Sequence, residues 1–185
     1  TARLGEISKL TGGKLALVAG RKVPAGVLDN NSAELPAWMT SPEEMDIVDM
    51  VLAGKMNKYI VRLCSRFMPA VGLSGSDGRL FTGVRLACEE GERTCTGEIT
   101  KVDVSLLRLL LDNGYTPVVS STSMDDEGTA LNINADEAAL AIAAAIPAKY
   151  LIFLSDVPGI LKDGQVIGTL HRKQVEEEIT AGTIA

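Results

Sequence analysis

Four short apolar runs, each preceded by a segment whose apolar residues recur at helical spacing, most constrain how this chain folds. The runs occupy residues 14–19, 69–73, 117–120 and 150–154. Runs of this length are typical of buried strands, whereas the preceding segments have the length and periodicity of helices. Helices that alternate with short apolar strands indicate an α/β domain in which crossover helices connect parallel strands. We therefore predict an α/β fold with a largely parallel sheet.

Capping residues indicate where two of these helices begin and where one ends. Ser41 supplies a hydroxyl N-cap, Pro42 stands at the first helical position and Glu44 completes a capping box. Asp103 is expected to cap a later helix, and Asn113-Gly114 is expected to end it.

The segments between the helices contain turn and hairpin signals. Residues 79–86 and 97–102 predict an exposed β-hairpin, and the Gly, Ser and Asp residues at 74–78 predict a turn. Residues 20–40 are rich in Gly, Pro, Asn and Ser, which predicts a long loop, and loops of that length are rarely idle inside compact domains.

The size and charge of the chain limit the classes of partner. Its 185 residues, 46% hydrophobic and 23% charged, suit one globular domain or one domain with two lobes. The net charge of -6 argues against nucleic acid or an anionic membrane as the main partner, because no basic field collects phosphates. The apolar runs are too short to span a bilayer. We expect a cytoplasmic protein that binds a small ligand.

The cysteines and the single histidine do not indicate a metal site or a nucleophile. Cys64, Cys88 and Cys95 lack zinc-ligand spacing, and His171 is remote from all three in the sequence. We expect buried or idle thiols and no metal site.

The polar opening of the segment 131–161 is the first candidate site. In open α/β sheets, ligands bind beyond the carboxyl ends of strands, where helices begin. Asn134 can cap the helix that follows, and Asp136 lies in its first turn, which a purely structural role would also explain. Asn132 precedes the cap, so its amide is expected to be free to bind a carboxylate or acyl group together with Asn134.

The second candidate site follows the apolar run 150–154. Asp156 comes almost directly after this run, and the Pro158-Gly159 turn would present it at the carboxyl end of a strand. A nucleotide-binding edge is expected there. No G-x-G-x-x-G follows a strand anywhere in the sequence, which argues against a nicotinamide oxidoreductase.

Six segments in the same order resemble the acetylglutamate kinase branch of the amino acid kinase family. The resemblance covers about residues 41–185. The segments are EEMDIVDMVLAGKMNK, AVGLSGSDGRLF, TGEITKVDVSLLRLLLDNGYTPVVSS, NINADEAALAIAAA, YLIFLSDVPGILKDG and EEEITAGTIA.

The resemblance implies a three-layer αβα sandwich that phosphorylates an amino acid derivative. Residues 1–148 would form an N-terminal lobe that binds the acyl amino acid under a hairpin flap at about residues 79–102, and residues 149–185 would begin a C-terminal ATP-binding lobe. The implied reaction is ATP-dependent phosphorylation of the side-chain carboxylate of N-acetyl-L-glutamate to an acyl phosphate, in arginine biosynthesis. ATP would enter with Mg²⁺ as a substrate complex, without a tightly bound cofactor. A homodimer through the Ser41–Arg66 helices is also implied.

The resemblance also assigns roles to individual residues. Asn132, Asn134 and Gly20 would bind the acyl amino acid, with Asn132 on the α-carboxylate side. Asp136 would organise catalytic lysines rather than act as a base. The nucleotide-binding residues would be Asp156, Val157, Pro158, Gly159, Ile160 and Leu161 on one side of ATP and Thr183, Ile184 and Ala185 on the other.

Departures from the family pattern leave two interpretations open. The family has a His-Gly-Gly-Gly loop where this chain reads Leu17-Val18-Ala19-Gly20-Arg21-Lys22, and Trp38 stands near the place of an expected arginine. The family's two catalytic lysines have no counterpart in the printed sequence. We expect the chain to be part of a longer kinase. The alternative is a divergent variant, either a kinase for an aminoadipate-type acyl amino acid or a non-catalytic ligand-binding or regulatory protein.

Overall fold

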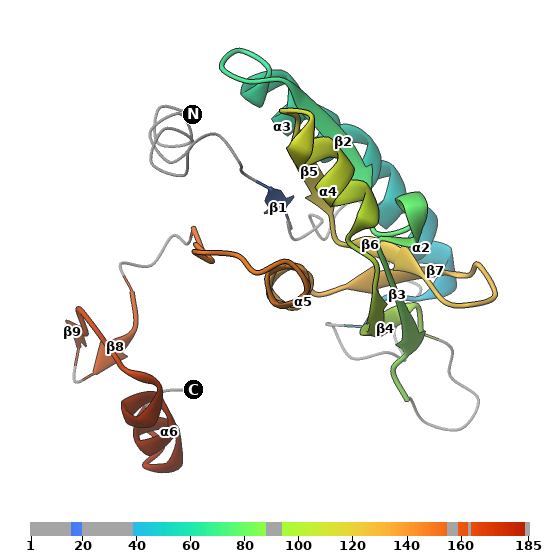
Figure 1. The fold of residues 1–185 in the computed structure, drawn as a ribbon. Helices are drawn as coiled ribbons and strands as arrows, with labels where there is room; N and C mark the ends of the chain where they lie inside the picture. Colours follow the sequence, from blue (N-terminus) through green and yellow to red (C-terminus); the bar gives the residue numbers. More distant parts are fainter. Residues whose placement is uncertain (1–15, 20–38, 88–93, 155–158, 163, 184–185) are drawn as a thin grey trace. The chain divides into compact units, whose positions relative to one another are not determined.

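The computed structural model describes residues 16–19, 39–87, 94–154, 159–162 and 164–183 (Figure 1). The chain divides into two compact units, Thr1–Leu151 and Ile152–Ala185. The first unit contains three parallel strands, the helices that cover them and a small ring of four further strands. The second unit contains a two-stranded hairpin and a helix. The predicted long loop at 20–40 and the predicted first helix lie almost wholly outside the described residues.

Three parallel strands form the sheet of the first unit. They are β1 (Leu17–Ala19), β5 (Thr116–Ser120) and β2 (Ala70–Ser74), in the order β1-β5-β2. Both pairings are parallel, and β2 pairs with β5 along its whole length. Strands β2 and β5 match the predicted apolar runs to within a residue or two, and β1 lies inside the third. The predicted parallel α/β arrangement is confirmed.

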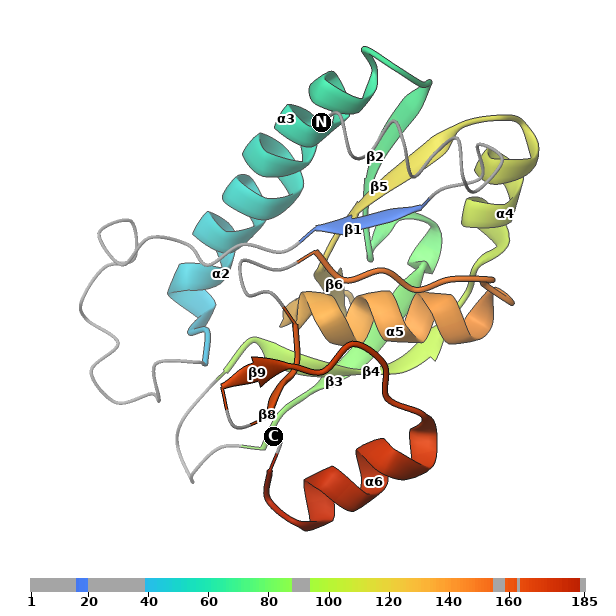
Figure 2. The same ribbon diagram turned by 90° about the vertical axis from the view of Figure 1, so that its left-hand side faces the viewer.

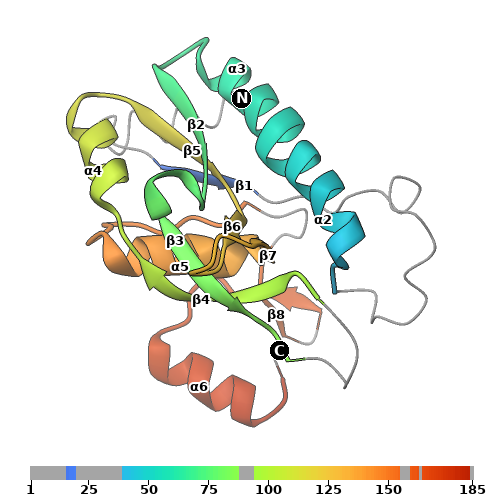
Figure 3. The ribbon, with the colours of Figure 1, turned by 90° about the vertical axis from the view of Figure 1, so that its right-hand side faces the viewer.

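Helices cover both faces of this sheet and make three layers (Figures 2 and 3). Helix α3 (Asn57–Cys64) covers the face of Gly72, because a Cβ built on Gly72 would meet Asn57, Lys58 and Val61. The opposite face contributes Val18, Leu73 and Val119 to the main core. That core also contains residues of α4 (Ser105–Asp112) and α5 (Ala135–Ala145), namely Leu107, Ala138 and Ile142. Alternate residues of each strand therefore face different helix layers.

A π-helical stretch joins α2 (Pro42–Asp49) to α3 and was not expected from the sequence. It spans Met50–Met56. The buried positions of the segment are 44, 45, 48 and 52, and the next buried position, 57, follows after a step of five residues and precedes 64. A step of five matches the i to i+5 hydrogen bonding of a π-helix, which turns the buried stripe relative to an ideal α-helix. The predicted capping box of Ser41 and Glu44 is confirmed at the start of α2.

Four short strands close into a ring of pairings beside the sheet. They are β3 (Phe81–Arg85), β4 (Thr96–Val102), β7 (Ala130–Ile133) and β6 (Thr122–Met124), in that order around the ring. Leu131 is fully buried inside it. Gly83 allows the close approach of β3 and β4, because a Cβ there would lie 2.2 Å from the carbonyl oxygen of Glu98. Strands β3 and β4 form the predicted antiparallel hairpin, but the first half of β3 is buried rather than exposed.

The predicted caps of the later helices are confirmed with one shift. Asp103 Oδ1 accepts the N–H of Ser105 at 2.8 Å, although the N-cap position itself falls on Val104. Gly114 follows α4 with φ +78°, a backbone conformation that favours glycine, so the predicted Asn-Gly helix end is present.

The predicted strand at residues 150–154 is wrong. These residues have no regular secondary structure, and each of their side chains is exposed, from 40% for Leu151 to 66% for Leu154. Among the described residues, none provides a strand that pairs with this run. An extended segment without a neighbour has no ladder hydrogen bonds, so apolar composition alone does not make it a strand.

The second unit contains two short strands and one helix. Strands β8 (Leu161–Lys162) and β9 (Gln165–Val166) form an antiparallel hairpin, and helix α6 (Arg172–Thr180) follows. The Lys162 ammonium donates to the Glu178 carboxylate, which fastens the hairpin to the helix and lowers the pKa of Glu178. Assignment of residues 1–148 and 149–185 to acyl-amino-acid and nucleotide lobes remains a prediction.

Candidate functional site

The carboxyl ends of the three parallel strands lie in one row. Ala19, Ser120 and Ser74 are register partners, so β1, β5 and β2 all end at this edge. The N–H of Ile133 donates to the carbonyl oxygen of Ser121 at 3.1 Å, which places the end of β7 beside the end of β5. The sheet edge at which α/β proteins bind ligands therefore lies next to residues 132–136. Gly20 follows β1 directly but lies outside the described residues.

Helix α5 begins at this edge with the predicted cap. The Asn134 side-chain oxygen accepts the N–H groups of Asp136 at 2.8 Å and Glu137 at 3.3 Å. The Asp136 carboxylate is in the first turn and exposed, in the positive field of the helix N-terminus. It is available to cations or to a polar ligand that approaches from solvent.

Glu137 fastens the start of α5 to the hairpin. Its Oε1 accepts the N–H of Ile99 on β4 at 2.8 Å. The strand pairing shifts by one residue between Thr82 and Gly83 of β3, beside the point where Ile99 pairs. Such an irregularity disrupts the hydrogen-bond ladder between the two strands. Here the N–H of Ile99 donates to the Glu137 carboxylate. The hairpin and the helix that contains Asp136 are thus joined by a hydrogen bond to a carboxylate.

The Asn132 amide is not free, which corrects the expectation from the sequence. Its Nδ2 donates to the hydroxyl of Thr40 at 2.9 Å, and its backbone N–H donates to the carbonyl oxygen of Cys95 at 2.8 Å. The side chain is half-buried. Asn132 and Asn134 therefore differ, because one is tied to the segment before α2 and the other caps α5. Their binding of an acyl amino acid remains a prediction.

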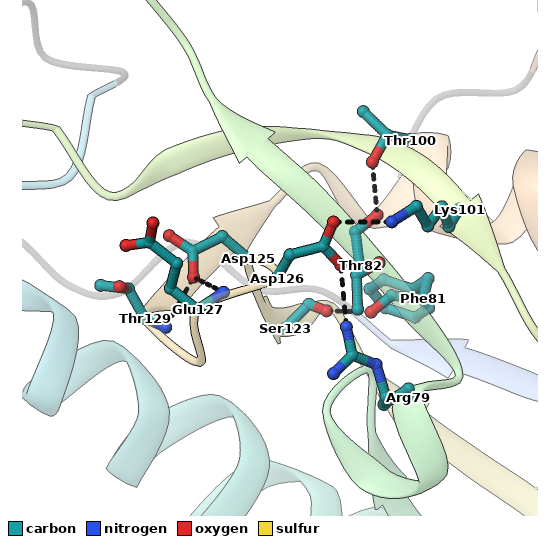
Figure 4. A network of polar contacts seen from close by, with 10 residues as sticks. All are labelled: Arg79, Phe81, Thr82, Thr100, Lys101, Ser123, Asp125, Asp126, Glu127 and Thr129. Atoms are coloured by element: carbon teal, nitrogen blue, oxygen red, sulfur yellow. Dashed lines mark hydrogen bonds and ion pairs between the residues drawn. The ribbon is translucent and has the colours of Figure 1, made fainter.

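A polar network ties the hairpin to the turn between β6 and β7 (Figure 4). Asp126 in that turn accepts from Arg79 at 2.8 Å and from Lys101 of β4 at 2.6 Å. The Lys101 hydrogen bond and charge, with Arg79 as a second cation, lower the pKa of Asp126. Ser123 of β6 donates to the carbonyl oxygen of Phe81 in β3. The base of the predicted flap is held on two sides, and its tip at 88–93 lies outside the described residues.

Burial shifts the pKa values of three further groups. Burial raises the pKa of the Asp49 carboxyl, a hydrogen bond from Thr122 opposes the shift, and the charge of Asp46 adds to it. Burial also raises the pKa values of the Cys64 and Cys95 thiols, so both thiols are weak nucleophiles at neutral pH. This confirms the expectation of buried thiols for these two residues, whereas Cys88 lies outside the described residues.

Some of the residues predicted to bind the nucleotide lie within the described part of the chain. Asp156, Val157, Pro158, Ile184 and Ala185 lie outside the described residues. Gly159 has φ +147°, and exposed Ile160 precedes exposed Leu161, the first residue of β8. Thr183 follows α6, and its N–H donates to the carbonyl oxygen of Glu178 at 3.0 Å. Within the second unit, Leu161 precedes Lys162 in the chain and Thr183 donates to Glu178, so the Lys162–Glu178 ion pair joins the two segments that contain Leu161 and Thr183.

Three residues of this region were not singled out from the sequence. Thr40 holds Asn132, and Glu137 holds the hairpin. Asn57 is 2% exposed and donates from Nδ2 to the carbonyl oxygens of Leu73 at 3.0 Å and Val118 at 2.7 Å. A polar amide close to the apolar positions Leu52, Met56 and Ile60 is a signal that could have revealed Asn57, whereas Thr40 gives no comparable signal.

The described residues contain neither a metal-binding cluster nor a membrane-spanning helix. Among these residues, no group of three or more His, Cys, Asp or Glu side chains is arranged to hold a metal ion. In the same part of the chain, no helix is both long enough and apolar enough to cross a bilayer.

Comparison with known proteins identifies the family of this three-layer α/β domain. The chain matches the amino acid kinase family over residues 2–185 and belongs to that family. It is 46% identical over 152 residues to an acetylglutamate kinase of Nostoc sp., covering 80% of this chain and 50% of that protein. It is 43% identical over 151 residues to an acetylglutamate kinase of Methanocaldococcus jannaschii, covering 76% and 50%. The chain thus spans about half the length of these curated relatives.

Solved structures agree on the fold. The crystal structure of smu.665 from Streptococcus mutans UA159 matches with a TM-score of 0.70 and 26% identity, over 80% of this chain and 60% of that one. An N-acetylglutamate synthase from Neisseria gonorrhoeae matches with a TM-score of 0.59 and 21% identity, over 70% and 30%. The second likeness concerns the fold alone.

Proposed function

We propose that the full protein to which this chain belongs transfers the γ-phosphoryl group of ATP to the side-chain carboxylate of N-acetyl-L-glutamate. The observation that supports this most directly is the placement of Asn132 and Asp136 beside the carboxyl edge of the parallel strands in a chain 46% identical to an acetylglutamate kinase. The product would be an acyl phosphate, as arginine biosynthesis requires. We expect the reaction to take place in the cytoplasm.

The proposed chemistry needs positioning more than acid-base catalysis. A carboxylate oxygen attacks the γ-phosphorus, the bond to the β–γ bridging oxygen breaks, and ADP leaves. Because the attacking group is already an anion, no general base is required, and the main task is to align two anions and neutralise the charge between them. Magnesium would arrive on ATP as part of the substrate complex.

Three groups of the first unit have separate roles in this proposal. The Asn132 amide would bind the α-carboxylate side of the acyl amino acid, and Asn134 and Gly20 would also contribute to binding of this substrate. The Asp136 carboxylate, exposed at the start of α5, would hold cationic side chains that neutralise the transferring phosphoryl group. The hairpin of β3 and β4, anchored by Glu137 and Asp126, would cover the acyl group.

The nucleotide and the dimer contact would use other parts of the chain. Residues 156–161 and 183–185 would bind ATP, which is supported by the Lys162–Glu178 ion pair that joins the segment containing Leu161 to the segment containing Thr183. A homodimer would form through the helices of residues 41–66. Exposed Met50 and Tyr59 on these helices support that contact, because large apolar side chains in solvent favour association.

A second candidate function is favoured by the sequence that follows β1. The run Ala19-Gly20-Arg21-Lys22 replaces the glycine-rich loop of the family, so the protein would act on a related acyl amino acid of the aminoadipate type or bind its ligand without phosphoryl transfer. Parallel assays with both acyl amino acids separate these outcomes.

The direct test is hydroxylamine trapping in the full-length protein. N-acetyl-L-glutamate with ATP and Mg²⁺ should give an acyl hydroxamate, and omission of ATP should abolish it. Asp136→Asn should lower kcat at least about a hundredfold while changing KM for the acyl amino acid little, because its proposed partners matter most in the transition state. Asp112→Asn, an exposed change at the end of α4, serves as the control. No hydroxamate with wild-type protein would rule out the proposed reaction.

A further inference from the structure

Thr40 is fastened to the hairpin through its backbone. It is 6% exposed, its N–H donates to the Thr96 hydroxyl at 2.8 Å, and its carbonyl oxygen accepts the N–H of Cys95 at 2.7 Å. The hydroxyl of Thr94, itself buried, donates to the same carbonyl oxygen at 3.2 Å. These contacts fix the position of Thr40 against Thr96, the first residue of β4, and the two residues that precede it.

The side chain of Thr40 is directed to Asn132. Its hydroxyl oxygen accepts from Asn132 Nδ2 at 2.9 Å. The two residues are also joined through Cys95, whose N–H donates to Thr40 and whose carbonyl oxygen accepts from the N–H of Asn132. Thus the backbone and the side chain of Asn132 are both held relative to Thr40.

Such an arrangement fixes the direction of the remaining polar atoms of the amide. A planar carboxamide has two N–H donors and one carbonyl acceptor. When one N–H is bound to a buried hydroxyl, the second N–H and the carbonyl oxygen point in set directions. A ligand that binds them then loses less side-chain freedom on binding, which favours affinity.

We propose that Thr40 is a positioning residue that orients the Asn132 amide toward the acyl amino acid, an inference that rests on the proposed function of Asn132. Thr40 acts through Asn132 and does not itself react. The hydroxyl of Thr40 is the group that holds Asn132, so serine at position 40 should preserve the orientation of the amide, whereas valine, which has no hydroxyl, should not.

The first test follows the Asn132 side chain itself in the full-length protein without ligand. NMR order parameters of the ¹⁵N-labelled Asn132 NH₂ group should fall in Thr40→Val and Thr40→Ala and stay near the wild-type value in Thr40→Ser. Thr116→Val is the matched control, since Thr116 is a buried threonine on β5. An amide that is equally ordered in all variants would overturn the positioning role, whatever the enzymatic activity.

The second test follows the kinetics. Thr40→Val should raise KM for N-acetyl-L-glutamate by about tenfold, the effect of one lost hydrogen bond, with kcat nearly unchanged. In an Asn132→Ala background, Thr40→Val should have no further effect on KM. A rise in KM of the same size in the Asn132→Ala background would show that Thr40 does not act through Asn132, and it would overturn the inference. An inactive wild-type protein would overturn the proposed function instead, and the NMR result would still decide the role of Thr40.

Discussion

Replacing Asn57 with alanine removes a side chain that bridges two parallel strands. The same side chain occupies the space that a Cβ on Gly72 would need. Asn57 Nδ2 donates to the carbonyl oxygens of Leu73 in β2 and Val118 in β5, and the side chain is 2% exposed. Each neutral hydrogen bond contributes about 0.5–1.5 kcal/mol net, and a buried group left unpaired costs more. With the small cavity that remains, we expect Asn57→Ala to lower the free energy of unfolding by about 2–4 kcal/mol.

Gly72→Ala should be destabilising for a reason that depends on Asn57. A Cβ on Gly72 would lie 2.0 Å from Asn57 Oδ1, 2.6 Å from Lys58 Nζ and 3.0 Å from Val61 Cγ2. The lysine end can move, but the amide is held by two carbonyl oxygens. We expect a loss of about 1–3 kcal/mol, as for other overpacked sites. In an Asn57→Ala background the main clash is absent, so the same change should cost under about 1 kcal/mol.

Urea unfolding of the two single variants and the double variant in the full-length protein measures this coupling. The double variant should be more stable than the sum of the single changes predicts by about 1–2 kcal/mol. Gly54→Ala is the control, because a Cβ there has nothing within 4 Å and helix propensity favours alanine. Additivity of Asn57→Ala and Gly72→Ala within about 0.5 kcal/mol would refute the packing argument.

Two further predictions concern titratable groups. Burial raises the pKa of Asp49 in the folded state above its ordinary value of 3.8. Between these two pKa values the folded state binds more protons than the unfolded state, so the stability of the protein falls as the pH rises from 3.8 through the folded pKa. Asp49→Asn should therefore raise Tm at pH 7, with a gain that fades toward pH 3.8, and a gain independent of pH would contradict this cause. Peptide-level mass spectrometry after iodoacetamide treatment should find Cys64 and Cys95 unmodified in native protein and modified in urea, whereas rapid native labelling would contradict their burial.

The features that the sequence predicted well depend on residues close together in the chain. The Ser41–Glu44 capping box and the Asn134 cap each join residues no more than three positions apart. Apolar runs also located β2 and β5, and β5 fits the expectation for a central parallel strand because it lies between β1 and β2 and all of its residues are buried. Such interactions can be derived from spacing alone.

Features that depend on distant partners could not be derived in this way. The run 150–154 has the composition of a strand, but strand formation requires a neighbour that composition does not specify. The π-helical stretch at Met50–Met56 accompanies a five-residue step between the buried positions Leu52 and Asn57, and the same apolar residues would suit an ordinary α-helix. Thr40 and Asn132 are 92 positions apart, so their hydrogen bond has no local signature.

The two asparagines of the candidate site illustrate why residue type alone does not assign a role. Asn134 uses its side-chain oxygen twice, for the N–H groups of Asp136 and Glu137, so toward a ligand it can offer its amide nitrogen. Asn132 uses one N–H for Thr40, and among the described residues its second N–H and its side-chain carbonyl oxygen have no further hydrogen-bond partner. An acyl amino acid has a carboxylate that needs donors and an amide N–H that needs an acceptor. Asn132 can serve both needs, whereas Asn134 is restricted to the carboxylate or the acyl oxygen as long as it caps α5.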